Sequence, residues 1–301
     1  MNEQFAHANG IELCYETFGD RSDPALLLIM GLGTQMVAWR EDFCRALADR
    51  GFFVIRYDNR DCGRSTKMKG KPVSLIELTT RRPRDLPYTL DDMADDAVGL
   101  LDELGIDRAH VVGASMGGMI AQHVGFSHPD RVLSLVSIMA STGHRLVGQP
   151  RLTVIPLFLS RPTGGKQEYL DRAVKLFRAV GSTKFFDEEG VREIAALGWE
   201  RGIDMAGTGR QLGAITADGN RTKRLGRITA PTLVIHGTDD KLVSPSGGRA
   251  TARAIPGARL MMVEGMGHDL PRPLWPKLID AIVENTTRAA DPNPRVSTTY
   301  P

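Results

Sequence analysis

The chain has 301 residues, of which 42% are hydrophobic and 25% are charged, and its formal net charge is +2. This length suits one large α/β domain, alone or with an insertion, better than two separate units. The small net charge argues against nucleic acid as a partner, because it produces no strong positive field. Cys14, Cys44 and Cys62 lack metal-ligand spacing, which indicates reduced thiols and no metal site.

The N-terminal residues show no basic stretch followed by an apolar stretch, so the sequence predicts no secretory signal. No apolar run reaches the ~18 to 20 residues of a membrane-spanning helix. We therefore expect a cytoplasmic protein without a transmembrane segment. Peripheral contact with a lipid surface, as in association with the cell envelope, remains compatible with this expectation.

The first elements along the chain are predicted to be strands. Asn9-Gly10 separates two segments of alternating polarity, which predicts an antiparallel hairpin. Continuous apolar runs are expected of strands that are buried on both faces of a parallel sheet. Six such runs follow the hairpin, at residues 25–30, 52–57, 109–113, 132–139, 232–236 and 259–263.

Helical patterns separate most of these runs. Thr89-Leu90-Asp91-Asp92 resembles a capping box and predicts a helix that reaches Leu104. Alternating strands and helices with right-handed crossovers give a mostly parallel, doubly wound sheet with helices on both faces. The other predicted helices of this part span residues 39–49, 116–127 and 274–285.

The alternation stops between residues 142 and 226, where only helical patterns occur, at 166–180, 188–197 and 201–215. We interpret residues 142–226 as a helical cap inserted into a core made of residues 1–141 and 227–285. Residues 286–301 have no apolar period, so we expect a disordered tail. Most aromatic residues of the insertion are expected to form its own core, and a minority to line an acyl pocket: Phe158, Tyr169, Phe177, Phe185, Phe186 and Trp199.

One short motif carries the chemistry. Gly113-Ala114-Ser115-Met116-Gly117 matches G-x-S-x-G and lies directly between a predicted strand and a predicted helix. Such a tight turn needs glycine two residues before and after the serine. A dinucleotide site would need glycine at position 115, and a phosphate loop would need G-K-[ST], which is absent. The pattern favours a nucleophile elbow that presents Ser115 over a plain glycine-rich turn.

A serine nucleophile needs a base and a carboxylate that orients the base. The run T-L-V-I-H-G-T-D-D ends a predicted strand and supplies Asp239 and Asp240. The run R-L-M-M-V-E-G-M-G-H-D ends the next one and supplies His268. The order Ser, Asp, His along the chain is the order expected of a triad on an α/β sheet.

These three segments resemble the triad loops of the α/β-hydrolase superfamily, and the resemblance extends over about residues 10–285. It implies the α/β-hydrolase fold and a serine esterase that needs no cofactor. It also implies that Asp240, rather than Asp239, is the acid of the triad. Met30-Gly31-Leu32-Gly33 follows the first parallel strand, where the family places its oxyanion loop, with Met30 in place of a common histidine. The resemblance implies an oxyanion hole formed by the backbone N–H groups of Leu32 and Met116.

The run Y-D-N-R-D-C-G-R-S, which begins at Tyr57, resembles a structural loop of the same family, so Cys62 is expected to serve packing. With the Met-Gly loop and the ending G-M-G-H-D-L-P, it makes the chain similar to the aclacinomycin-methylesterase group and to mycobacterial Lip-type (lipase G-like) esterases. This resemblance implies a hydrophobic carboxylic ester, including a lipid ester, as substrate. A thioesterase, a carbon–carbon hydrolase or a perhydrolase would use the same residues. A ligand-binding protein that keeps the fold without catalysis is the alternative from another class.

Overall fold

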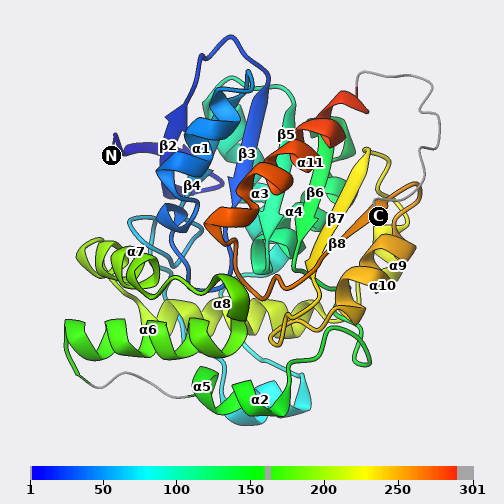
Figure 1. Ribbon diagram of the computed structural model, residues 1–301. Helices are drawn as coiled ribbons and strands as arrows, with labels where there is room; N and C mark the ends of the chain where they lie inside the picture. The colour runs from blue at the N-terminus through cyan, green and yellow to red at the C-terminus, as the bar shows by residue number, and fades with distance from the viewer. Residues whose placement is uncertain (1, 160–163, 290–301) are drawn as a thin grey trace.

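The computed structural model describes residues 2–159 and 164–289. Within these residues eight strands form a single sheet in the order β1-β2-β4-β3-β5-β6-β7-β8 (Figure 1). The six predicted strands of the parallel part are confirmed to within about one residue at each end, and both strands of the predicted hairpin are present. They are β1 (Gln4–Ala8), β2 (Ile11–Phe18), β3 (Ala25–Ile29), β4 (Phe53–Tyr57), β5 (Ala109–Ala114), β6 (Val132–Ile138), β7 (Thr232–Gly237) and β8 (Arg259–Val263).

The sheet begins with the predicted hairpin. Asn9 and Gly10 form its turn with φ values of 49° and 77°, which is the backbone geometry that Asn-Gly favours in a tight hairpin. β1 pairs with β2, and β2 pairs with β4, in antiparallel orientation. The remaining pairs from β4 to β8 are parallel, so the carboxyl ends of these six strands meet at one edge.

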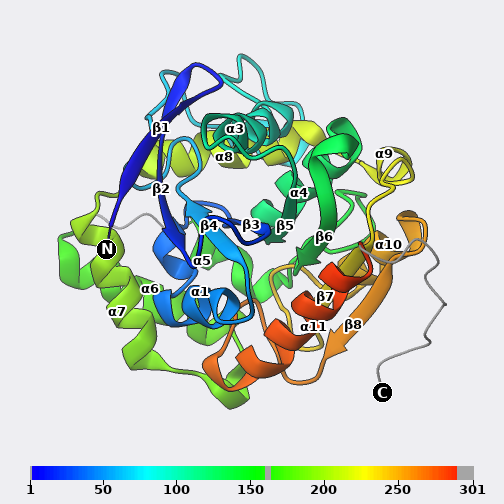
Figure 2. The same ribbon diagram turned by 90° about the horizontal axis from the view of Figure 1, so that it is seen from above.

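Helices cover both faces of the sheet, as the alternating pattern predicts (Figure 2). α3 (Leu90–Glu103) and α4 (Met116–Ser127) bury their apolar side chains against one face. α1 (Glu41–Ala48) and α11 (Trp275–Thr287) do so on the other. Every residue of β5 is buried, which is the reason that its sequence is continuously apolar rather than alternating.

Of the helices between β6 and β7, α5 to α8 lie beyond the carboxyl edge of the sheet, whereas α9 lies next to α10, which spans Ser246–Ala254 (Figure 1). α6 ends at the residue where the 166–180 pattern ends, whereas α7 continues past its predicted end. α8 begins later than predicted because Gly202, with a φ of 97°, turns the chain first. The helices of this region are α5 (Ile155–Leu159), α6 (Lys166–Val180), α7 (Glu188–Glu200), α8 (Met205–Asp218) and α9 (Thr222–Leu225).

Among the described residues, the sequence pattern missed four α-helices. They are the short α5 and α9, together with α2 (Leu75–Thr80) and α10. Gly247 and Gly248 follow the first residue of α10, and two glycines weaken a helical pattern. Gly248 is nevertheless required there, because a Cβ at this position would lie 2.5 Å from the Nδ1 atom of His236. Among the helices of residues 2–159 and 164–289, none combines the length and the apolar character needed to cross a membrane.

The prediction that the chain is disordered from residue 286 is wrong at its start. α11 continues to Thr287, and Thr286 is buried. Just before it, the side-chain amide of Asn285 donates to the backbone oxygens of Leu135 and Pro231, at 3.1 and 3.2 Å. Hydrogen bonds of polar side chains thus stabilise the last residues of α11, where the sequence no longer has a periodic pattern of apolar residues. Residues 290–301 lie outside the described residues.

His110 predicts a pH dependence of stability. It lies in β5, where burial lowers the pKa of its imidazole to about 4. An unfolded histidine has a pKa of about 6.5, so between these values only the unfolded chain binds this proton. The free energy of unfolding should therefore fall by about 3 kcal/mol as the pH drops from about 6.5 to 4.

Chemical denaturation over this pH range, with wild type and His110→Asn, measures the effect. The variant is expected to lack this part of the pH dependence. An identical slope in both proteins would contradict the assignment to His110.

Candidate active site

The turn at Ser115 connects β5 to α4 and has the tight geometry that the motif predicts. Ser115 has φ 58° and ψ −120°, a strained conformation for a residue with a side chain. A Cβ at Gly113 would lie 2.0 Å from the Gly117 backbone oxygen, and one at Gly117 would lie 2.1 Å from the backbone oxygen of Ile29. Both glycines are thus required by backbone that approaches them.

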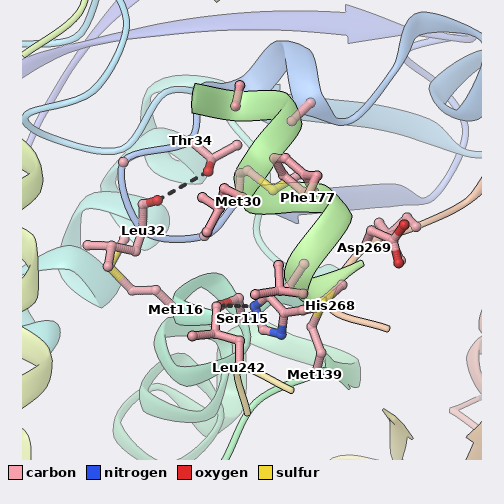
Figure 3. A pocket seen from close by; sticks show the side chains of 18 of the residues that line it. Met30, Leu32, Thr34, Ser115, Met116, Met139, Phe177, Leu242, His268 and Asp269 are labelled. Atoms are coloured by element: carbon pink, nitrogen blue, oxygen red, sulfur yellow. Dashed lines mark hydrogen bonds between the residues drawn. The ribbon is translucent and has the colours of Figure 1, made fainter. Parts of the chain in front are cut away.

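The structure brings Ser115, His268 and Asp240 together at the carboxyl edge of the sheet (Figure 3 for Ser115 and His268). The Oγ atom of Ser115 lies 2.9 Å from Nε2 of His268. The Nδ1 atom of the same ring lies 2.8 Å from Oδ2 of Asp240. Asp239 is exposed, and its carboxylate accepts a hydrogen bond from Thr238 instead. Of the two candidate carboxylates, Asp240 is the one that contacts the histidine.

The Asp240 carboxylate is fixed on all sides. Its Oδ1 atom accepts hydrogen bonds from the backbone N–H groups of Leu242 and Val243, at 2.9 and 2.8 Å. Its Oδ2 atom contacts His268 and lies 3.4 Å from Nε2 of the buried His236. Burial by itself would raise the pKa of Asp240, but the two histidines hold this pKa well below its usual range. The carboxylate is therefore ionised and able to orient the ring of His268 and to stabilise it when it is protonated.

The loop after β3 lies directly against Ser115. A Cβ at Gly31 would lie 3.0 Å from the Cβ of Ser115, so glycine allows the close approach. Leu32 and Met116 line the same cavity as Ser115, with Met116 at the first turn of α4 (Figure 3). Backbone N–H groups at a helix N-terminus favour negative charge in front of them.

Side-chain amides hold this loop in place. Met30 occupies the position where the family commonly has a histidine. The amide of Asn59 donates to the backbone oxygen of Met30, at 2.9 Å. The N–H of Gly33 donates to Oε1 of Gln211 in α8, at 2.8 Å. Gln211 also donates to the backbone oxygen of Arg60, at 2.8 Å. No pattern in the sequence indicates the role of Gln211, because no local motif marks a helix residue whose partner lies far along the chain.

The loop after β4 is structural. Its Asp58 accepts hydrogen bonds from the backbone N–H groups of Met36 and Arg64 and forms an ion pair with the buried Arg201, at 2.8 Å. Asp61 of the same loop pairs with Arg210 of α8 through two hydrogen bonds of 2.8 Å. Cys62 is buried, which agrees with a packing role.

A cavity of about 730 Å³ opens above Ser115 and His268. Most of its lining side chains are aliphatic or aromatic. The expectation that most aromatic residues between β6 and β7 form a separate core is wrong, because four of the six line the cavity. Tyr169, Phe177, Phe185 and Phe186 line it, Trp199 packs on Tyr169, and the Phe158 side chain lies outside the described residues.

Among residues 2–159 and 164–289, no group of three or more histidine, cysteine, aspartate or glutamate side chains is arranged so that it could hold a metal ion. His123 pairs with Asp91 and Asp218, at 2.6 and 3.0 Å, and joins α3, α4 and α8. This histidine is therefore part of the packing between helices.

The fold and this arrangement of residues are those of an α/β hydrolase. The sequence model of the α/β hydrolase fold family matches residues 24–271, and the chain belongs to this family. Among similar proteins is rhodomycin D methylesterase DauP from Streptomyces sp. (strain C5). It is 32% identical, and the match covers 93% of this chain and 96% of that protein.

Two lactonases are also similar. The 3-oxoadipate enol-lactonase 2 of Acinetobacter baylyi is 27% identical, over 85% of this chain and 86% of its own. A crystal structure of the enol-lactonase from Burkholderia xenovorans superposes with a TM-score of 0.74 at 26% identity, and the match covers 94% of this chain and all of that one (100%).

Gly117 predicts a large loss of stability when it is replaced. In Gly117→Ala the new Cβ would meet the Ile29 backbone oxygen at 2.1 Å, so β3 and α4 would have to separate. We expect a loss of several kcal/mol, about 3 or more, in the free energy of unfolding. Denaturant titration measures this loss.

Gly165→Ala is the matched control, because a Cβ at Gly165 meets no atom within 4 Å. This control should change stability by about 1 kcal/mol or less. Equal effects of the two substitutions would contradict the close approach of β3 and α4.

Proposed function

We propose that this protein is a serine hydrolase that cleaves a hydrophobic carboxylic ester through an acyl-enzyme on Ser115. One observation carries the proposal. A hydrogen-bonded series runs from Ser115 through His268 to Asp240, and it lies at the floor of an apolar cavity. The similarity to a methylesterase and to enol-lactonases supports ester chemistry.

The proposed reaction begins when Oγ of Ser115 attacks the ester carbonyl carbon and Nε2 of His268 takes the hydroxyl proton. The backbone N–H groups of Leu32 and Met116 stabilise the negative oxygen of the tetrahedral intermediate. The carbon–oxygen bond then breaks, and the alcohol leaves with the proton from His268. Asp240 holds the ring in the tautomer that makes both transfers possible.

The second half of the proposed reaction repeats these roles with water. Water attacks the acyl-enzyme and gives its proton to His268, and collapse of the second intermediate returns a proton to Ser115 as the acid leaves. The proposed residues supply every proton transfer, so the proposed mechanism uses no cofactor and no metal. We also propose that residues 142–226 act as a cap, because their aromatic side chains form much of the cavity wall.

The first experiment tests Ser115 as the nucleophile. Steady-state hydrolysis of p-nitrophenyl esters from acetate to palmitate, with a thioester alongside, should show a maximum at one chain length. Ser115→Ala should lose activity by about 10³-fold or more, because the covalent step disappears. Preference for the thioester would move the proposal to a thioesterase. Unchanged activity in the variant would contradict the role of Ser115 as nucleophile. Absence of activity in both proteins would favour a non-catalytic binding protein.

We further propose that the mouth of the cavity contacts an anionic lipid surface. Large hydrophobic side chains are 60% to 84% exposed in two segments, 75–81 and 146–152, which both contribute residues to the cavity. Arginines accompany them in the sequence. Arg81 of the first segment donates to the backbone oxygen of Gly143, at 3.5 Å, three residues before the second segment begins. Apolar side chains with adjacent arginines suit insertion at an anionic headgroup region. These residues are Leu75, Ile76, Leu146 and Leu152, with Arg81, Arg82, Arg84, Arg145 and Arg151.

Co-sedimentation with vesicles of phosphatidylcholine, with and without phosphatidylglycerol, tests this contact. Wild type is expected to bind the anionic vesicles better, and Ile76→Glu with Leu152→Glu to weaken binding by about 10-fold or more. Phe5→Glu is the control, because Phe5 is 49% exposed on β1 and does not line the cavity. Binding that is absent in wild type, or equal in all variants, would contradict the proposal.

A further inference from the structure

The loop that carries His268 is attached to the end of α6. The backbone N–H of His268 donates to the oxygen of Val180, at 2.8 Å. The N–H of Gly267 donates to Oγ of Ser182, also at 2.8 Å. The two segments lie so close that a Cβ at Gly267 would meet the backbone carbon of Gly181 at 2.3 Å. Residues 180–182 come from the region between β6 and β7, whereas the histidine loop follows β8.

Ser182 holds this loop on both sides of the histidine. Its hydroxyl accepts from Gly267 and donates to Oδ1 of Asp269, at 2.5 Å. Its backbone N–H donates to the same oxygen, at 2.9 Å. Ser182 is fully buried, so no solvent competes for these bonds. The two residues that flank His268 in the sequence are thus fixed by one side chain.

Asp269 does not replace Asp240 in this arrangement. Figure 3 shows Asp269 turned away from the pair formed by Ser115 and His268. Asp240 contacts the imidazole ring itself, from the loop after β7. Asp269 and Ser182 instead fix the backbone from which the ring extends. Orientation of the ring and placement of its backbone therefore come from different parts of the chain.

We propose that Ser182 and Asp269 are positioning residues that keep His268 within reach of Ser115, so that the site is complete only while residues 180–182 rest on the histidine loop. This inference rests on the proposed function of His268 as the base. Phe177 connects the arrangement to the cavity, because it lines the cavity and its backbone oxygen accepts from the N–H of Gly181, at 2.7 Å. A bound substrate would therefore contact the same helix end that holds the base.

Ser182→Ala tests the proposal, with Ser134→Ala as a matched control. Ser134 is also a buried serine, and its hydroxyl bonds to His110 at the opposite end of the sheet. Both variants should lose thermal stability, but only Ser182→Ala should lower kcat, by about 10-fold to 100-fold, with KM changed by about two-fold or less. Equal kcat values in the two variants, or a raised KM with unchanged kcat in Ser182→Ala, would overturn the proposal.

Substitutions of Asp269 separate hydrogen bonding from charge. In Asp269→Asn the amide oxygen can accept both bonds from Ser182, so kcat should stay within about three-fold of wild type. The kcat of Asp269→Ala should fall as far as the kcat of Ser182→Ala. The kcat of the double variant should fall no further, because both residues act through one cluster. Additive losses in the double variant, or a loss in Asp269→Asn equal to that in Asp269→Ala, would overturn the shared role.

The rate at which a fluorophosphonate labels Ser115 gives a readout independent of ester turnover. This rate should fall in Ser182→Ala by the same factor as kcat, because His268 assists both reactions. A labelling rate equal to that of wild type would overturn the positioning role. Failure of the proposed function itself looks different, because Ser115→Ala would then keep its esterase activity.

Discussion

The turn at Ser115 is the constraint on which the rest of the site depends. The chain leaves β5 and enters α4 within one residue, and this sharp change of direction raises the side chain of Ser115 above the sheet edge. Only glycine fits at positions 113 and 117, because neighbouring backbone fills the space that a side chain would need. The burial of β5 and α4 holds the strained residue in place, since relaxing it would separate two well-packed elements.

Parallel pairing then decides what surrounds the serine. Since β3, β5, β7 and β8 point the same way, the loops after them open on one edge of the sheet. Residues as distant in sequence as Leu32, Ser115 and His268 therefore meet around one cavity, and the buried Asp240 contacts His268. The pairing of the strands places these loops at one edge whatever the conformation of each loop. Short motifs at strand ends are therefore informative.

The region between β6 and β7 does more than cover the cavity. Buried ion pairs join it to the loop after β4, where Asp58 meets Arg201 and Asp61 meets Arg210. Removing one partner of a buried ion pair lowers the stability of the fold strongly, because the other charge stays buried without compensation. Hydrogen bonds from the same region reach the loops after β3 and β8. The geometry of the candidate site therefore depends on contacts with helices that lie outside the sheet.

The sequence by itself determined the sheet, its hairpin and the candidates Ser115 and His268, because each leaves a local pattern: a continuous apolar run, Asn-Gly, or a short motif at a strand end. The pattern alone left Asp239 and Asp240 both open, and only the resemblance to the family implied Asp240. Only the tertiary structure decided that most aromatic side chains between β6 and β7 face the cavity and that α11 continues past Asn285. It alone showed Gln211 and Ser182 beside loops far away in the sequence. Burial and turn geometry produce local patterns in the sequence. A hydrogen bond between two segments that are distant in sequence produces no recognisable pattern in either segment.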